Sequence, residues 1–297
     1  MDKQLNRYID PLTDFGFKHL FGSEPDKEIM IEFLNALFEG EKHIVDLIYS
    51  PTEHAGVDGE EKKVFFDLTC TGKDGEKFII EMQRTPQTYF KDRCIFYMSR
   101  LISGQITKGI KDYSQLKGVF LIGILEFPFN DNNSHHMRNI SLMDRNNGEV
   151  FYRDMGYKFL VLPNFDKKEH ELESDLDRWF FLLKNLSTLE KIPDYLDKRI
   201  FQKLFKIAEV SKLTKEQREI YESNLKAKED YYNSISYAAE LAAKAAAEAA
   251  TEAATEKARK ERENRDKEIV ANAKKLGMSN ESIVQLTGLP LEEIEKI

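Results

Sequence analysis

The stretch VFFDLTCTGKDGEKFIIEMQR, residues 64–84, decides the fold, because it reads as two β-strands joined by a tight turn. Residues 64–71 and 77–84 are apolar runs rich in the side chains that favour strands. The connection between them contains the sequence KDG, residues 73–75, which is typical of a hairpin turn. We therefore predict a β-hairpin whose turn is centred on Asp74.

The two faces of this hairpin differ in chemistry. One face is apolar and is expected to meet the core, and it carries Phe66, Leu68, Phe78, Ile80 and Met82. The opposite face carries Asp67, Thr69, Ile79, Glu81 and Gln83. A loop of residues 73–75 places Asp67 directly opposite Glu81, with Cβ atoms about 4.5–5.5 Å apart. A carboxylate in the middle of each strand is unusual, because Asp is depleted in strands.

Two opposed carboxylates indicate a metal site. Like charges so placed repel each other, and a hard cation between them removes the conflict. Mg²⁺ prefers oxygen ligands at about 2.0–2.1 Å, so Asp67 and Glu81 are candidate ligands. Gln83 lies two residues beyond Glu81 on the same face and could hold an attacking water. The alternative is that both acids lie on the solvent face of an open sheet.

The rest of the chain predicts an α/β fold with a mixed sheet. Apolar residues at helical spacing indicate helices over residues 26–39 and 89–112, and from about residue 174 to 237. Short apolar runs indicate strands over residues 44–49, 150–155 and 158–163. Residues 118–127, GVFLIGILEF, read as a central strand buried on both faces. This order gives a hairpin meander plus a strand reached through a helical crossover.

The pattern Asp67-x13-Glu81-x-Gln83, between two helices, resembles the PD-(D/E)XK nuclease superfamily. More narrowly, three stretches look like the bacterial PD-(D/E)XK transposase family, also called recombination-promoting nucleases; they are PLTDFGFKHLFG, FFDLTC with KFIIEMQR, and KDRCIFYMSRLISGQITKG. The resemblance covers about residues 8–130 well and the rest loosely. It implies a restriction-endonuclease-like core, a mixed central sheet flanked by helices, followed by an α-helical C-terminal region.

The resemblance also implies a chemistry, the metal-dependent cleavage of DNA phosphodiesters with Mg²⁺, for which Mn²⁺ would substitute. Asp67 and Glu81 match the metal-binding acids, and Gln83 completes the catalytic set where the superfamily usually has Lys. A lysine would activate water and balance phosphate charge, whereas Gln orients water without adding charge. Asp14 matches an acid in the family's opening motif and is a candidate third metal ligand, although an Asp near a helix start is commonly a cap.

Residues on the helix after the hairpin are candidates to supply the positive charge that Gln83 lacks. Arg93, Tyr97 and Arg100 follow i, i+4, i+7 spacing and therefore share one helix face. An arginine fork suits phosphate oxygens, so this face is a candidate DNA-phosphate contact, and Lys18 in the opening block is another. The alternatives are a merely solvated face and a half-buried, packed Tyr97.

We expect four regions along the chain: a nuclease-like core over 1–170, a helical region packed on it over 171–237, an Ala/Glu/Lys-rich helical spacer over 238–267 and a small helical tail over 268–297. The spacer consists of residues with the highest helix propensity and lacks large apolar side chains beyond its first turn. The tail resembles small helix-turn-helix units, and DNA contact, a helical cap and oligomerisation are its three interpretations.

Composition limits the function classes. The net charge of −8 argues mildly against nucleic acid but does not exclude it, because the local field decides binding. The two cysteines, Cys70 and Cys94, form no CxxC pattern, which is typical of free thiols in a reducing cytoplasm. The first residues lack the apolar run of a signal peptide, and no apolar stretch is long enough to span a membrane. We therefore expect a cytoplasmic protein without membrane contact. The function hypothesis is a metal-dependent DNA endonuclease associated with mobile elements or recombination. The alternative is a non-cleaving DNA-binding or regulatory module on a degenerate nuclease fold, and homo-oligomers through the C-terminal helices are a further expectation.

Overall fold

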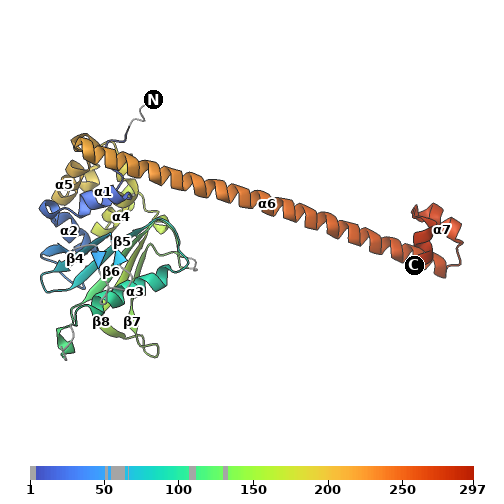
Figure 1. The fold of residues 1–297 in the computed structure, drawn as a ribbon, viewed down its shortest axis with the longest axis horizontal. Helices are drawn as coiled ribbons and strands as arrows, with labels where there is room; N and C mark the ends of the chain where they lie inside the picture. Colours follow the sequence, from blue (N-terminus) through green and yellow to red (C-terminus); the bar gives the residue numbers. More distant parts are fainter. Residues whose placement is uncertain (1–4, 51–52, 55–63, 66, 107–111, 130–132) are drawn as a thin grey trace. The chain divides into compact units, whose positions relative to one another are not determined.

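The structure is a computed structural model, and it describes residues 5–50, 53–54, 64–65, 67–106, 112–129 and 133–297 (Figure 1). The chain divides into two compact units, Met1–Lys226 and Ala227–Ile297. A single helix, α6 (Lys215–Lys275), begins in the first unit and continues in the second.

The first unit is built on a six-stranded sheet in the order β1-β4-β5-β6-β8-β7. The strands are β1 (Leu47–Ser50), β4 (Leu68–Gly72), β5 (Lys77–Gln83), β6 (Val119–Leu125), β7 (Met137–Met143) and β8 (Val150–Val161). The central strands β5, β6 and β8 are parallel, and antiparallel strands complete both edges. The sheet is therefore mixed, and the expected α/β class is confirmed.

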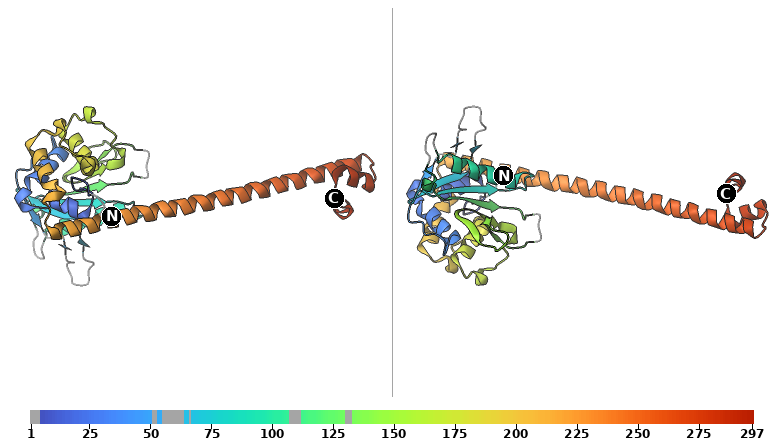
Figure 2. Two further views of the ribbon diagram at one scale, coloured as in Figure 1. Left: turned by 90° about the horizontal axis from the view of Figure 1, so that it is seen from above. Right: turned by 90° about the horizontal axis from the view of Figure 1, so that it is seen from below.

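Helices cover both faces of this sheet (Figure 1, Figure 2). Phe78, Ile80 and their neighbours pack against α1 (Asp14–Phe21), α2 (Glu28–Leu37), α4 (Asp175–Asn185) and α5 (Arg199–Ala208). On the other face, Ile79 and Leu121 pack against α3 (Phe90–Ser103). All seven residues of β6 are buried, as expected for a strand with apolar layers on both sides.

The predicted hairpin forms with the expected register. Leu68 pairs with Ile80 and Thr71 with Lys77, which centres the turn on Asp74. The backbone N–H of Gly75 donates to the carbonyl of Gly72, and the φ of Gly75 is 89°, a value that glycine adopts without strain. The first strand is shorter than predicted, since β4 begins at Leu68 and the short β3 (Val64–Phe65) pairs instead with β2 (Glu53–His54). Phe66, predicted in the core, lies outside the described residues.

Two predicted boundaries are wrong. The helix predicted over 89–112 ends at Ser103 with Gly104 as its cap, and residues 107–111 lie outside the described part of the chain. The strands predicted over 150–155 and 158–163 are one strand, β8, because Gly156 pairs in the ladders with both Phe120 of β6 and Ser141 of β7. The strand β7 was not predicted, because its residues are exposed or half-buried and show no buried apolar run.

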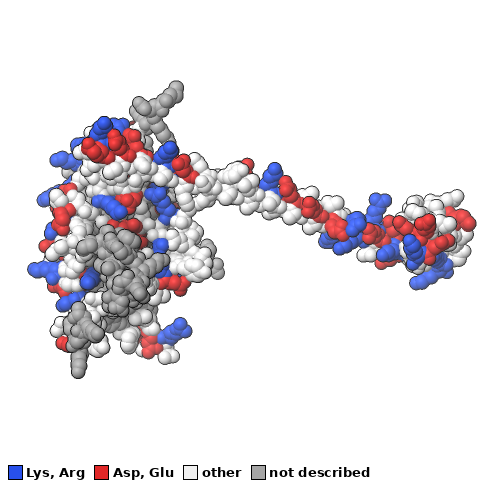
Figure 3. Space-filling view, viewed as in Figure 1, with Lys and Arg blue, Asp and Glu red and all other residues white. Residues whose placement is uncertain are grey.

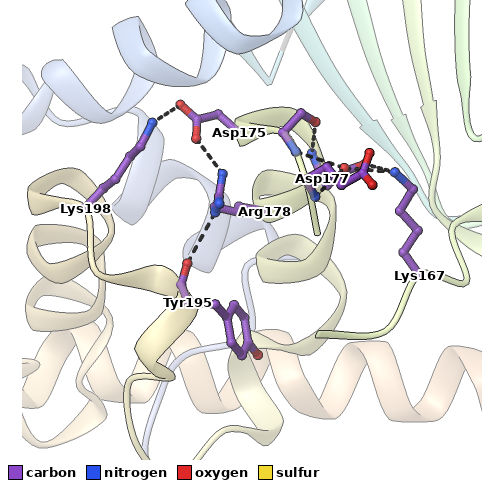
Figure 4. Close-up of polar contacts among 8 residues, drawn as sticks. Lys167, Asp175, Asp177, Arg178, Tyr195 and Lys198 are labelled. Carbon is purple, nitrogen blue, oxygen red and sulfur yellow. Dashed lines mark hydrogen bonds and ion pairs between the residues drawn. The ribbon is translucent and has the colours of Figure 1, made fainter. Parts of the chain in front are cut away.

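The start of α4 is held by a dense polar network (Figure 4). Asp177 accepts the backbone N–H groups of Ser174 and Glu173, and the ammonium of Lys167 lies 2.9 Å from both of its carboxylate oxygens. The Ser174 hydroxyl in turn accepts the N–H of Asp177, which completes a capping box. This network fixes the helix that carries Trp179, a side chain buried in the core.

The second unit is mostly one helix. The region predicted as a spacer, residues 238–267, lies inside α6. After Gly277 the chain continues into α7 (Asn280–Thr287) and α8 (Leu291–Lys296), and Val270, Ala273, Ile283 and Ile294 form the buried cluster at this end. Among the helices of the described residues, none is long and apolar enough to cross a membrane.

Candidate active site

The hairpin and the residue before it bring Asp67 and Glu81 together. Asp67 directly precedes β4, and Glu81 lies in the middle of β5. The backbone N–H of Asp67 lies 3.4 Å from Oε1 of Glu81, and the N–H of Met82 donates to Oδ2 of Asp67 over 2.7 Å. The β4–β5 ladder ends at the pair Leu68 and Ile80, and these two hydrogen bonds join the next residue, Asp67, to Glu81 and Met82 beyond it.

This pair lies beneath α3 and is not on the solvent face of an open sheet. Glu81 is only 6% exposed and Asp67 is half-buried. Burial, with the charge of Asp67 as the next cause, raises the pKa of Glu81 to about 8, while Arg93 opposes this rise. Burial also raises the pKa of Asp67, against the hydrogen bond from Met82 and the charge of Lys18. The fold thus holds two carboxyls whose charged forms lack full compensation from protein groups.

Gln83 reaches the same pair from the end of β5. Its amide Nε2 donates to Oε2 of Glu81 over 3.3 Å, and the side chain is half-buried. This hydrogen bond fixes the orientation of the carboxamide, so that its oxygen is turned away from Glu81. A carboxamide oxygen can accept a hydrogen bond from a water but cannot supply a positive charge.

The helix α3 carries two of the three predicted phosphate-binding residues to the acids. The positive charge of Arg93 partly counteracts the rise in the pKa of both Asp67 and Glu81. The guanidinium carbon of Arg93 lies 5.7 Å from the centroid of the Tyr97 ring. Burial, then the charge of Glu81, raises the pKa of Tyr97 and keeps its hydroxyl protonated. The guanidinium of Arg100 instead lies 5.8 Å from the ring centroid of Phe96.

The helix α1 supplies the opening-block residues. Asp14 and Lys18 are exposed and form an ion pair of 2.7 Å, and both charges act on the pKa of Asp67. Thr13, whose hydroxyl accepts the N–H of Gly16, is the cap of this helix. Asp14 therefore does not serve as the cap, and it lies on the side of the helix that influences the acid pair.

Two side chains that were not selected from the sequence, Arg84 and Glu126, lie at the ends of the strands that carry the site. Arg84 donates to the carbonyl of Leu12, which joins the end of β5 to the approach to α1, and its Nε lies 3.9 Å from Oε2 of Glu126. The backbone N–H of Glu126 donates to the carbonyl of Gln83. The signal in the sequence was the pair of charged residues that directly follow the buried strands β5 and β6.

The donors of this site fit a hard divalent cation held by few protein ligands. Both carboxylates are oxygen donors, and burial raises the pKa of each, so a bound cation would relieve the cost of their charge. Within the described residues no group of three His, Cys, Asp or Glu side chains is placed to hold a metal. Mg²⁺ is commonly held by one or two carboxylates, with waters and substrate phosphates completing its shell. Asp67 and Glu81 satisfy that pattern.

Comparison with known proteins supports the resemblance to a nuclease family. A sequence model of the family described as PD-(D/E)XK nuclease family transposase matches residues 11–238. Neither the curated proteins nor the solved structures returned a match. The matched span contains Asp14, Asp67, Glu81, Gln83 and Arg93, and it ends where the alanine-rich part of α6 begins.

Proposed function

The chain belongs to the PD-(D/E)XK nuclease family transposases, and from that membership we propose that it is a metal-dependent DNA endonuclease associated with mobile elements or recombination. The observation that carries the proposal is the buried acid pair Asp67 and Glu81, in which burial raises the pKa of both carboxyls. Perturbed acids grouped in this way are typical of functional sites. The proposal includes a cytoplasmic location in a bacterial cell, which suits the free, buried Cys70 and Cys94.

In the proposed mechanism, Asp67 and Glu81 would hold Mg²⁺, or Mn²⁺ in its place, with Asp14 as a candidate third acid. The bound cation would polarise the scissile phosphate and lower the pKa of a water. Gln83, anchored by its hydrogen bond to Glu81, presents its carboxamide oxygen to the attacking water and orients it.

The positive charge that a superfamily lysine would bring comes from other side chains in this proposal. Arg93 acts on both acids and would neutralise a phosphate oxygen beside them. Tyr97 stays protonated at neutral pH, so its hydroxyl would donate to the phosphate. Lys18 and Arg100 are further candidate contacts for the DNA backbone.

Plasmid nicking tests this proposal directly. Purified full-length protein is incubated with supercoiled DNA in Mg²⁺, Mn²⁺ or EDTA, beside the variants Asp67→Ala and Glu81→Ala. We expect nicking that needs the metal and falls about a hundredfold or more in each variant. Glu39→Ala, which removes an exposed acid beyond the end of α2, is the matched control and should nick like wild type. Metal-dependent nicking that persists in Asp67→Ala would refute the site.

A non-cleaving module is the second candidate, and Gln83 in the place of a lysine is the feature that favours it. Folded wild-type protein that nicks DNA in neither metal but shifts DNA in EDTA would replace the first proposal with this one. In either case the proposal includes self-association of the chain through its C-terminal helices.

A further inference from the structure

Among the described residues of the second unit, the part of α6 between residues 238 and 268 contributes no side chain to the buried cluster. Nearly every residue in it is exposed, the exceptions being the half-buried Glu256 and Asp266. Helices in proteins draw most of their stability from packing against other elements. The exposed side chains of this segment are therefore candidates for packing against a second helix.

The segment divides into two halves of opposite net charge, and charged side chains of both signs lie along the helix (Figure 3). Residues 238–256 carry four Glu and one Lys, a net charge of −3, and residues 257–267 carry six Lys or Arg and three acids, a net charge of +3. In the first half, Glu248 and Glu252 are one turn apart, and neither has an ion-pair partner within the described residues. Like charges at this spacing destabilise an isolated helix. The first half of the segment therefore contains a repulsive pair, and its side chains before Glu256 make none of the ion pairs that stabilise the segment from Glu256 onward.

The same pattern is favourable for two copies of α6 running in opposite directions. Glu240, Lys244 and Glu248 are spaced by four residues and form one stripe, and Arg259, Glu263 and Lys267 form another. Antiparallel pairing about a point between residues 253 and 254 aligns the two stripes. It brings Glu240 opposite Lys267, Lys244 opposite Glu263, and Glu248 opposite Arg259 of the second copy.

A parallel pairing would be repulsive. In parallel two-stranded coiled coils, flanking residues meet partners about five positions further along the other helix. Between residues 256 and 268, whenever both residues of a pair five positions apart are charged, the two charges have the same sign. These pairs are Glu256 with Glu261, Lys257 with Arg262, Lys260 with Arg265, Glu261 with Asp266, Arg262 with Lys267 and Glu263 with Glu268. The charges thus select direction as well as partner.

Side-chain size agrees with the antiparallel direction. The alanine-rich residues 245–250 would lie against residues 257–262, which are mostly Lys, Arg and Glu. Long side chains cover small neighbours with their methylene stems while their charged ends stay in water. The local ion pairs of Arg259 with Glu256, at 2.9 Å, and Glu263, at 3.6 Å, are exposed and of the kind that exchanges at little cost.

We propose that α6 docks on α6 of a second copy of this chain, antiparallel, around a two-fold axis between Ala253 and Ala254. The pairing rests on the proposed self-association and on no assumption about cleavage. Because the axis is two-fold, each of the three charge pairs occurs twice in the dimer.

Charge exchange in the full-length chain tests the partner. The variant E240K/E248K and the variant R259E/K267E each place like charges at both ends of the pairing, so each should dimerise at least about tenfold more weakly than wild type. A mixture of the two restores opposite charges at both ends and should form a heterodimer of wild-type affinity. The quadruple variant carries all four changes in one chain, and it should dimerise like wild type, which controls for local effects on the helix.

Cysteine cross-linking tests the direction. The native Cys70 and Cys94 are buried, so Glu240→Cys and Lys267→Cys each introduce an accessible thiol. We expect the mixture of these two variants to cross-link and neither variant to cross-link with itself. A dimer mass with like-with-like cross-links would overturn the antiparallel direction, and a mass of 34.6 kDa at every concentration would overturn the association itself. Plasmid nicking, measured separately, reports on the nuclease proposal alone.

Discussion

Two buried acids in the same unit, Asp177 and Glu81, differ in what the fold supplies to them. Burial alone would raise the pKa of Asp177, but Lys167 and two backbone N–H groups more than offset burial, so its pKa is lowered. Glu81 receives the amide of Gln83 and a long contact from the N–H of Asp67, and its pKa is raised to about 8. An acid whose partners are complete stabilises a helix start. An acid whose partners are incomplete is suited to binding a cation from outside.

The largest expected effect is a contrast between two variants. Asp177→Asn should lower stability and leave cleavage intact, whereas Glu81→Gln should raise stability and abolish cleavage. Asp177→Asn should lower stability by about 2 kcal/mol, because it breaks the ion pair to Lys167. That corresponds to a fall in Tm of roughly 4–8 °C. Glu81→Gln should raise Tm in EDTA, because a neutral amide removes the cost of keeping a buried carboxyl protonated above its ordinary pKa, and it should abolish metal-dependent nicking.

Thermal melts and nicking assays on the same protein samples compare the stability and the cleavage activity of the two variants. Asp177→Asn should keep wild-type nicking below its Tm. If Glu81→Gln instead melts several degrees below wild type in EDTA, Glu81 is a structural acid and the contrast between the two residues fails.

A second, smaller effect is an opposite dependence of stability on pH. The pKa of Glu81 is raised from 4.5 to about 8, so its stabilising contribution is fully present below about pH 4.5 and is lost as the pH rises through about 8. The pKa of Asp177 is lowered from 3.8, so its contribution is present above pH 3.8 and is lost as the pH falls through the lowered value.

Melts in EDTA from pH 3 to 9 compare wild type with each variant. Glu81→Gln should flatten the loss of stability between about pH 5 and 8, and Asp177→Asn should flatten only the acid limb. Adding Mg²⁺ to wild type should restore stability near pH 8, because a cation stabilises the charged pair. A wild-type curve that rises steadily from pH 5 to 8 in EDTA would contradict the raised pKa of Glu81.

The smallest expected effect concerns the cations near the two acids. Lys167 contacts Asp177 directly, whereas Arg93 acts on Glu81 through its charge while its guanidinium donates to Gln87. Arg93→Ala should lower nicking about tenfold, Arg93→Lys should lower it less, and Tyr97→Phe should lower it by a few-fold. Lys91→Ala on the exposed part of α3 is the matched control. Equal losses in Lys91→Ala and Arg93→Ala would show general binding of DNA by charge and no specific role of Arg93.

Much of the hairpin could be predicted because its determinants are local. The turn residues set the register of the pairs from Leu68 with Ile80 to Thr71 with Lys77, and this register predicts that Asp67 lies near Glu81, as the hydrogen bonds of Asp67 bear out. The buried strand β6 was predicted for a similar reason, since a continuous apolar run has few other solutions. The exposed β7 gave no such signal, and the single strand β8 was predicted as two strands, over residues 150–155 and 158–163.

The sequence by itself determined the pairing of the two acids, the class of the fold and the helical nature of residues 238–267, because turn chemistry, side-chain alternation and helix propensity act over neighbouring residues. Only the tertiary structure decided that α3 covers the acid pair, that α1 brings Asp14 and Lys18 close enough to act on Asp67, and that the pKa of Glu81 rises to about 8. Desolvation and Coulomb interactions depend on which distant segments pack together, and that information exists only once the chain has folded.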